Sequence, residues 1–483
     1  MEITTEIRAK IDAWFEGGRS SALAADLVRL LDQKSVLGAP EAGAPYGRDA
    51  RTALDLSREL LRERGIETTL FEDMMAEGVV AGTSAAEPLL GILVHVDVVD
   101  ADASEWTSDP FRGAIRDGVI YGRGATDNKG PAIAAFYAAE AARELAKELG
   151  DGGGLREGLK ILVGSAEEIG CVDITRWLEV NTPPRYVFAP DANYPLVNVE
   201  KGRFTLDFER SWEASAATPR VTSIRGGATR NIIPGAASAT IEGLQRNDIQ
   251  PLLERFTNET VAEFELTETP SGVRINALGK AAHSSLPWNG NNAQTALIAL
   301  LNALPLAQCG STEAIAALAT LFLHGDCYGN ALGVAMSDEV SGVLTLSFNV
   351  LNFTETGLAA NFDSRTTQSA DSFPLLDTAA NALQRNGFAV TNHSMTLCHV
   401  TDENDEFVQT LLKIYRDFTG DTASKPLALG GTTYVHNIPG GVAFGTELPG
   451  CNNRIHGRDE FITIDELIES TKMFTAAILA ICG

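Results

Sequence analysis

Residues 89–99 read LLGILVHVDVV, a continuous apolar run with a histidine and an aspartate near its end. Such a run is typical of a strand that is buried on both faces of a sheet. The segment PAIAAFYAAEAARELAKEL at 131–149 predicts an alanine-rich helix with proline in its first turn. Two more short apolar runs follow, at 159–166 and 185–190. Strands and a helix at this spacing predict an α/β fold with a mostly parallel sheet flanked by helices.

The pattern changes between about residues 203 and 397. Polar and apolar residues alternate there, for example in FTLDFERSW at 204–212, which suits antiparallel strands with one solvent-exposed face. After about residue 400 helical patterns return, and Thr463 with Glu466 forms a T-x-x-E capping box before the last helix. We therefore predict one α/β domain, built from residues 1–202 and 398–483 and interrupted by an inserted α+β domain at 203–397.

Composition and charge exclude several classes of protein. Hydrophobic residues make up 44% and charged residues 21% of the 483, as in a globular protein with a large core. The 38 basic against 64 acidic residues give a net charge of -26, so we expect no nucleic-acid partner and no anionic membrane surface. The six cysteines form no C-x-x-C pair, and the first 15 residues contain no apolar signal-peptide core. We expect reduced thiols and a cytoplasmic protein.

Acidic and histidine side chains stand where the predicted strands end. Ligands of open α/β sheets bind in the crevice at the carboxyl ends of the strands. The first run leads into His95-Val96-Asp97, and the later ones lead into acidic pairs or loops. Two further candidates lie in the loops before the alanine-rich helix and before the last helix. The candidate ligands are therefore His95, Asp127, Glu168, Asp191 and His456.

This set of side chains has the chemistry of a site for two divalent metal ions. Imidazole and carboxylate are the usual ligands of zinc, with manganese or cobalt as alternatives. Five ligands serve two ions if one carboxylate bridges, and such a pair polarises a carbonyl and activates a water. Glu167, beside Glu168, is then the natural general base, since it stays off the metals. Asp97 lies on the strand face of His95 and is placed to hold its second ring nitrogen.

Each of these residues also has a purely structural interpretation. A single H-x-D sequence arises readily by chance, two adjacent glutamates are usually a solvated loop, and an aspartate after proline is a common turn residue. Their recurrence at successive strand ends favours the metal site. The chain lacks the motifs G-x-x-x-x-G-K-[ST], G-x-S-x-G and H-E-x-x-H, which argues against phosphate binding, a serine nucleophile elbow and a zincin helix.

Longer blocks of the sequence carry a resemblance to a known family. Residues 95–131 read HVDVV-x(6)-W-x(3)-PF-x(6)-GVIYGRGATDNKGP. The later blocks are EEIG (167–170), APDANYPL (189–196), VEKG (199–202), RNIIPG (230–235), AAHSSLPWNGNNA (281–293) and GGTTY (430–434). In this order they resemble the co-catalytic di-zinc metallopeptidase family of aminoacylase, carboxypeptidase G and carnosinase. Within that family the chain is most similar to the bacterial dipeptidase V-like branch.

The resemblance implies a role for each matching residue. His95 and Asp191 would bind one metal ion, Glu168 and His456 the other, and Asp127 would bridge both. Asp97 would orient His95, and Glu167 would be the general base and proton shuttle. The inserted domain would act as a lid, and its functional residues would stabilise the oxyanion or hold the carboxylate end of the substrate. These lid residues are His283 for the oxyanion, with Asn231 and Arg365 for the carboxylate.

The chain departs from the family pattern at a few positions. Asn128 stands where the family commonly has a second aspartate, and Asp100 replaces a commoner proline. His436 follows the GGTTY block in place of the usual small and basic residues, so its role is open between specificity and a plain loop position. These changes spare the ligand candidates and Glu167, so they bear on specificity more than on activity.

The first hypothesis for function is a metal-dependent hydrolase that cleaves the peptide bond of dipeptides or short peptides. An N-acyl-amino-acid deacylase or a single-residue carboxypeptidase is the alternative within the family. A non-catalytic binding protein on the same fold is the alternative from another class, and the intact Glu167 argues against it. The large insert resembles the enlarged lid of the dipeptidase branch, which implies that His283 serves its own chain and that the protein is a monomer.

Overall fold

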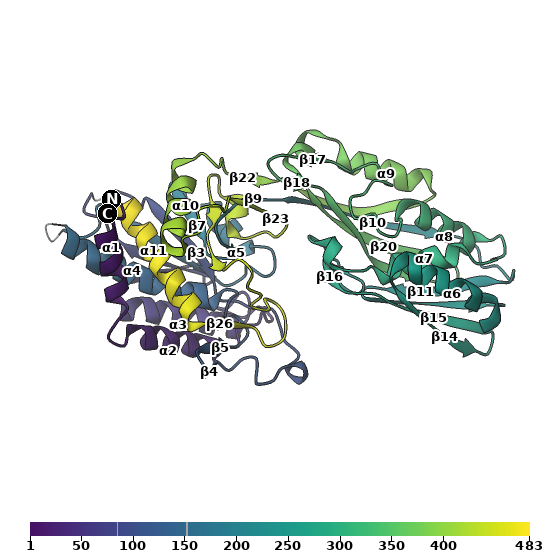
Figure 1. Ribbon diagram of the computed structural model, residues 1–483, viewed down its shortest axis with the longest axis horizontal. Helices are drawn as coiled ribbons and strands as arrows, with labels where there is room; N and C mark the ends of the chain where they lie inside the picture. Colours follow the sequence, from purple (N-terminus) through teal and green to yellow (C-terminus); the bar gives the residue numbers. More distant parts are fainter. Residues whose placement is uncertain (85, 151–152) are drawn as a thin grey trace. The chain divides into compact units, whose positions relative to one another are not determined.

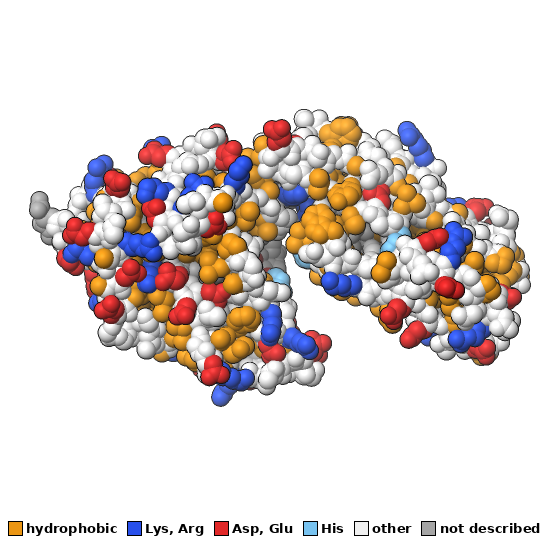
Figure 2. Space-filling model, in the orientation of Figure 1, with side chains coloured by type: hydrophobic (Ala, Val, Ile, Leu, Met, Phe, Trp, Pro, Cys, Tyr) orange, Lys and Arg blue, Asp and Glu red, His pale blue; other side chains and the backbone are white. Residues whose placement is uncertain are grey.

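The computed structural model describes residues 1–84, 86–150 and 153–483, which divide into two compact units (Figure 1). Unit 1 comprises Met1–Val199 and Val400–Gly483, and unit 2 comprises Glu200–His399. Within the described ranges, no helix is long and apolar enough to cross a membrane. Acidic and basic side chains are interspersed over both units on the face shown in Figure 2.

Unit 1 is built on a mixed sheet with the order β1-β2-β6-β3-β7-β24-β9-β22, and β23 also pairs with β9. Strands β6, β3, β7 and β24 run parallel to one another in the centre. The strands are β1 (Glu67–Phe71), β2 (Met75–Val80), β3 (Leu90–His95), β6 (Leu159–Gly164), β7 (Tyr186–Ala189), β9 (Val197–Glu200), β22 (His399–Val400), β23 (Leu427–Leu429) and β24 (Val442–Ala443). The predicted α/β fold is confirmed.

The central strand β3 is buried over its whole length because helices cover both faces of the sheet. Successive side chains of a strand point to opposite faces. Ile92 and Val94 accordingly belong to the large core formed with α4 (Lys129–Leu149) and α11 (Ile464–Cys482). Leu93 instead packs with Trp177 of α5 (Val172–Leu178) in a second core. His95, two residues after Leu93, lies on the α5 face, where its ring meets that of Tyr434 edge to face. Because of this alternation, the His95 side chain lies on the opposite face of the sheet from α4.

The helices of unit 1 begin and end as their sequences dictate. In α4 every residue from Lys129 to Ala139 is buried, since small alanine side chains let the helix pack closely against both the sheet and α11. The capping box predicted at Thr463 and Glu466 is present at the start of α11. The helices are α1 (Thr5–Trp14), α2 (Arg19–Leu31), α3 (Arg48–Glu63), α4 (Lys129–Leu149), α5 (Val172–Leu178), α10 (Glu406–Thr419) and α11 (Ile464–Cys482).

A buried ionic cluster joins α2, α3 and α4. The Asp26 carboxylate accepts hydrogen bonds from Arg29 and from the Tyr137 hydroxyl, at 2.8 and 2.9 Å, and it is also paired with the buried Arg64. Burial raises the pKa of Asp26, but these hydrogen bonds, Arg64 foremost, outweigh burial and lower it below its ordinary value. The ionised carboxylate therefore stabilises the fold of this helical layer.

Unit 2 holds an antiparallel sheet with the order β14-β15-β13-β11-β19-β20-β10-β21. Its apolar face forms a separate core with α6, α7, α8 and α9. The strands are β10 (Gly202–Ser211), β11 (Arg220–Gly226), β13 (Ala236–Glu242), β14 (Glu263–Thr269), β15 (Gly272–Leu278), β19 (Thr345–Phe353), β20 (Gly357–Thr366) and β21 (Ala389–Thr396). The helices are α6 (Arg246–Thr260), α7 (Ala293–Asn302), α8 (Gly310–Leu321) and α9 (Leu375–Arg385).

Short strand pairs complete both units. In unit 1, β26 (Phe461–Thr463) pairs with β5 (Val119–Tyr121), which also pairs with β4 (Ala114–Arg116). The segment 440–448, which the sequence favours as one buried strand, forms two short ones, because Gly445 turns the chain at a positive φ of 87°. Its first part is β24, and its second part, β25 (Thr446–Glu447), pairs with β8 (Ala192–Asn193). In unit 2 the pairs are β12 (Ile232–Ile233) with β16 (Ala282–His283) and β17 (Ser337–Asp338) with β18 (Gly342–Val343).

Candidate metal centre

The carboxyl ends of neighbouring parallel strands bring the predicted unit 1 residues together. His95 is the last residue of β3, and Glu167 and Glu168 follow β6 within four residues. Asp191 lies two residues after the end of β7, on the other side of β3. Because these strands are adjacent and parallel, their ends meet at one edge of the sheet. Asp127 joins them from the loop before α4.

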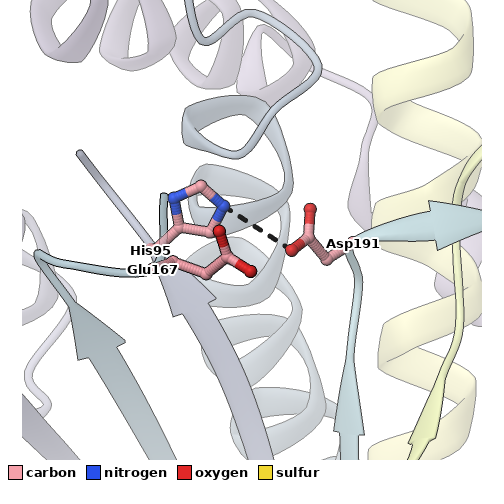
Figure 3. A group of neighbouring side chains, drawn as sticks. All are labelled: His95, Glu167 and Asp191. Carbon is pink, nitrogen blue, oxygen red and sulfur yellow. Dashed lines mark ion pairs between the residues drawn. The ribbon is translucent and has the colours of Figure 1, made fainter. Parts of the chain in front are cut away.

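The first of two groups of ligand atoms consists of His95, Glu167 and Asp191 (Figure 3). One side-chain atom from each lies within 4.8 Å of those of the other two. His95 Nε2 and Asp191 Oδ2 are 3.6 Å apart and point toward each other. Three converging donors of nitrogen and oxygen type are what a divalent ion such as zinc requires of a protein.

The second group consists of Asp127, Glu168 and His456. His456 Nε2 lies 2.9 Å from Asp127 Oδ2 and 3.2 Å from Glu168 Oε1. The other carboxylate oxygen of Asp127, Oδ1, lies 3.1 Å from His95 Nε2. Asp127 therefore faces one imidazole of each group, with a different oxygen toward each.

The geometry of both groups fits a metal ion. Two ligand atoms about 2.0–2.1 Å from one tetrahedral zinc lie roughly 3.3 Å from each other, close to the distances between these side chains. His95 Nε2 is buried and has no hydrogen-bond partner, although a buried ring nitrogen normally finds one. A nitrogen in that position, beside the carboxylates of Asp127 and Asp191, suits the ligand atom of a cation site.

The electrostatics of the two groups support the same interpretation. Burial lowers the pKa of His456, but hydrogen bonds to Asp127 and Glu168 outweigh it and raise that pKa to about 11. Burial also lowers the pKa of His95, but neighbouring carboxylates, Asp191 foremost, hold it well above its ordinary value. The carboxylates around both imidazoles thus favour a positive charge at each group, which is the charge that a metal ion would supply.

Asp97 contacts both His95 and the loop that carries Glu167 and Glu168. Its Oδ1 and Oδ2 accept hydrogen bonds from the backbone N–H groups of Glu167 and Glu168, at 3.2 and 3.1 Å. His95 Nδ1 lies 3.1 Å from the backbone carbonyl oxygen of Asp97, which can only accept, so Nδ1 donates. In the neutral ring this leaves the Nε2 lone pair directed at the ligand group.

Glu167 has the environment of a group that exchanges protons. Burial raises the pKa of its carboxyl well above the ordinary value; His95 opposes this, and Asp191 and Glu168 add to it. The Cys171 thiol donates to Glu167 Oε1 at 3.5 Å. Because this carboxylate belongs to the first ligand group, its position suits either a metal ligand or a base beside the metals.

Sequence reasoning missed several residues that hold these loops in place. Glu460 is fully buried, is paired with Arg123 at 2.7 Å, and accepts from the backbone N–H of Thr126 and Asp127 at 3.0 and 3.1 Å. It stands in the IHGRDE segment, four residues after His456, and this proximity was the available signal. The buried Asp173 accepts from the Tyr434 hydroxyl at 2.8 Å and from the backbone that leads into the glutamate pair.

The predicted residues of unit 2 lie in its strands or, for Asn231, directly before one. Asn231 and His283 are neighbours, since β12 pairs with β16 and Asn231 Nδ2 lies 3.5 Å from His283 Nε2. His283 Nδ1 lies 2.7 Å from Ser285 Oγ. Arg365, near the end of β20, is buried, and its guanidinium is 3.1 Å from the Asp363 carboxylate. The same Asp363 also pairs with Arg203.

The fold and the two ligand groups define the class of metal-dependent hydrolases. Residues 91–480 match the family described as Peptidase family M20/M25/M40, and the chain belongs to this family. The predicted family resemblance is thereby confirmed, and with it the prediction of a metallopeptidase.

Similar proteins cover nearly the whole chain. "Putative dipeptidase YtjP" of Bacillus subtilis (strain 168) is 31% identical over 439 residues, which are 90% of this chain and 91% of that protein. Human carnosine dipeptidase 1 has a similar structure, with a TM-score of 0.53 and 16% identity over 100% of this chain and 99% of that one. The M20 family metallo-carboxypeptidase Sso-CP2 from Sulfolobus solfataricus gives 0.52 and 19%, over 94% and 97%. At these identities the two structures show the common fold alone.

Proposed function

We propose that this protein is a metal-dependent dipeptidase, which hydrolyses the peptide bond of dipeptides or short peptides. The observation that carries the proposal is the position of Asp127, whose two oxygens face the imidazoles of two separate ligand groups at 3.1 and 2.9 Å. A carboxylate shared in this way is the bridging ligand of a two-metal site. Two bound ions would polarise the scissile carbonyl and lower the pKa of a water held between them.

Each residue of the two groups then has a role. His95 and Asp191 would hold one ion, Glu168 and His456 would hold the other, and Asp127 would serve both. We assign zinc to the sites first, with manganese or cobalt as alternatives, because nitrogen and carboxylate ligands suit all three. Asp97 orients the His95 ring through Nδ1 and fixes the backbone of the glutamate pair.

Glu167 is the general base. Its carboxylate takes one proton from the attacking water and delivers it to the nitrogen of the departing amine as the C–N bond breaks. The raised pKa of its carboxyl in the metal-free chain fits a group that must hold a proton during part of the cycle. Glu168 is less suited to this task, since its Oε1 is 3.2 Å from His456 Nε2 in the second group.

The inserted domain, 203–397, supplies the remaining groups as a lid. His283 stabilises the oxyanion, and its neighbour Asn231 helps to hold the carboxylate end of the substrate. Arg365 shares that task; its buried pairing with Asp363 fixes the guanidinium in one orientation. We further propose a monomer that provides its own His283, and a cytoplasmic location, which suits six free cysteines.

The substrate class rests on the relatives with dipeptidase names, and a substrate panel tests it. The full chain is stripped with a chelator, reloaded with Zn²⁺, Mn²⁺ or Co²⁺, and assayed on dipeptides, tripeptides and N-acyl amino acids. We expect dipeptide hydrolysis that is lost on chelation and restored by metal, with Asp127→Ala inactive under every loading. Preference for N-acyl amino acids would assign a deacylase, and release of single C-terminal residues from longer peptides would assign a carboxypeptidase. Binding of dipeptides without turnover would assign a non-catalytic protein.

A further inference from the structure

Asn128, the residue after the bridging carboxylate, is fully buried and joins separate segments of the metal centre. Its Oδ1 accepts a hydrogen bond from the backbone N–H of His95 at 3.3 Å. Its Nδ2 donates to the backbone oxygen of Pro190 at 2.8 Å and to Asp191 Oδ1 at 2.9 Å. One side chain therefore connects the end of β3, the loop after β7 and the start of α4.

The partners of this amide fix which of its atoms faces which way. A backbone N–H can only donate and a backbone carbonyl oxygen can only accept. Asn128 Oδ1 must therefore face the His95 backbone N–H, and Nδ2 must face Pro190 and Asp191. In the reverse orientation the amide NH2 would face the His95 N–H, and the amide oxygen would face the Pro190 carbonyl oxygen. The donation to Asp191 follows from these backbone partners and does not depend on how the amide is assigned.

This hydrogen bond determines which oxygen Asp191 can offer to a metal ion. Oδ1 is engaged by Asn128, whereas Oδ2 lies 3.6 Å from His95 Nε2, toward the ligand group. The carboxylate is thus held in a single orientation with one oxygen presented. The amide Nδ2 of Asn128 donates both of these hydrogen bonds. An ionised aspartate at position 128 would instead place an oxygen that cannot donate 2.8 Å from the Pro190 oxygen and 2.9 Å from Asp191 Oδ1.

We propose that Asn128 is a positioning residue of the His95–Asp191 metal site, and that its amide selects the Asp191 oxygen that binds the ion. The proposal rests on the two-metal function proposed above. It assigns Asn128 to one of the two sites only, because its side-chain hydrogen bonds reach His95, Pro190 and Asp191 and do not include Glu168 or His456. Loss of the amide should therefore weaken one ion and spare the other.

Zinc titration of the chelator-stripped full chain tests the proposal without reference to activity. Zn²⁺ is added in competition with a chromophoric chelator to the wild type and to Asn128→Ala. We expect one of the two ions to bind 10–100-fold more weakly in the variant, as is usual when a partner of a metal ligand is removed. The affinity of the other ion should stay within about threefold. Because binding is measured directly, the result can be read even if dipeptides prove not to be substrates.

Asn361→Ala is the matched control. Asn361 is a buried asparagine of unit 2 whose Nδ2 donates to the Leu206 backbone oxygen at 3.1 Å and to Asp207 Oδ1 at 2.6 Å. This is the same donor pattern, with partners that belong to neither ligand group. It should lower the unfolding temperature while leaving both zinc affinities unchanged. The proposal is overturned if Asn128→Ala leaves both ions within threefold of wild type, or weakens both equally. If that variant does not fold, Asn128→Ser is measured in the same way and read by the same criteria.

Discussion

Replacing the proposed base by its amide, Glu167→Gln, is the most direct test of the mechanism. The variant keeps the length of the side chain and an oxygen that can still accept from the Cys171 thiol. It also keeps the backbone N–H that donates to Asp97 at 3.2 Å, so the loop should hold its place. What is lost is the ability to take up a proton.

The expected loss of rate follows from the surroundings of Glu167. A positioned general base contributes roughly 10²–10⁴-fold to turnover, which corresponds to about 2.7–5.4 kcal/mol of barrier. The adjacent Glu168 cannot take over, since its Oε1 lies 3.2 Å from His456 Nε2 and its backbone N–H is held by Asp97. We therefore expect a fall of at least 10²-fold in kcat with little change in KM.

The same variant should stabilise the metal-free fold. Burial raises the pKa of Glu167 well above its ordinary value, so at pH values between the two the folded chain keeps a proton that the unfolded chain releases. This difference in proton binding costs stability above the ordinary pKa of about 4.3 and has no effect below it. In the metal-free state, Glu167→Gln should thus unfold at a higher urea concentration than wild type at pH 7, and at the same concentration near pH 4.

Steady-state kinetics on a dipeptide, with metal content measured on the same samples, decides the question. Both ions should remain bound in Glu167→Gln while turnover falls. Turnover within about tenfold of wild type, equivalent to ~1.4 kcal/mol, would refute the role of base. Loss of one metal ion would show instead that Glu167 is a ligand, which its place in the first ligand group also allows.

Three other outcomes follow from the structure. Asp127→Ala should lose both metal ions by elemental analysis, because both groups use this carboxylate; retention of either ion would contradict the bridging role. Mixing inactive His283→Ala chains with inactive Glu167→Gln chains should restore no activity, and recovery would refute the monomer that uses its own His283. Asp26→Asn removes the closest carboxylate from the buried Arg64, which keeps the longer pairing with Glu140 at 3.6 Å, and should cost up to about 3–5 kcal/mol of unfolding free energy at pH 7. Because the pKa of Asp26 is lowered in the fold, this difference should shrink as the pH falls below about 3.9; urea unfolding at pH 7 and 3 measures it, and a difference independent of pH would contradict the ionic contribution.

Periodicity and spacing predicted the parallel centre of the unit 1 sheet, since buried strands and an alanine-rich helix leave strong signals. The sequence signal was weaker for β1 and β2, the strands at one edge of this sheet. Strands β1 and β2 form an antiparallel hairpin whose turn places Glu72 and Asp73 at positive φ, without the glycine or asparagine that usually marks such a turn. Helices α1, α6 and α8 were also not predicted, and the insert was described mainly through its strands.

The candidate site shows a similar division between what sequence can and cannot reveal. Ligand candidates could be found because their residue types are chemically distinctive and recur at strand ends. Of the residues that orient them, Asp97 could be found from its place two residues after His95. Asn128 and Glu460 could not, because they bond to backbone groups 62 and 334 residues away in the sequence. Asp173 could not either, because it accepts from the Tyr434 hydroxyl, 261 residues away. The roles given to His283 and Arg365 depend on the family resemblance and stay predictions until variants are measured.

Strand β24 has a consequence for how the chain reaches its native state. Val442 and Ala443 lie between β7 and β9, so the middle of the unit 1 sheet is completed by residues that are made after unit 2. During synthesis, the edges of β7 and β9 that pair with β24 would stay unpaired until the 200 residues of unit 2 have been made. Pairing over such sequence distances slows folding and exposes aggregation-prone edges meanwhile. Unit 1 should therefore be the late-folding unit and the one most dependent on chaperones, although its first half is made first.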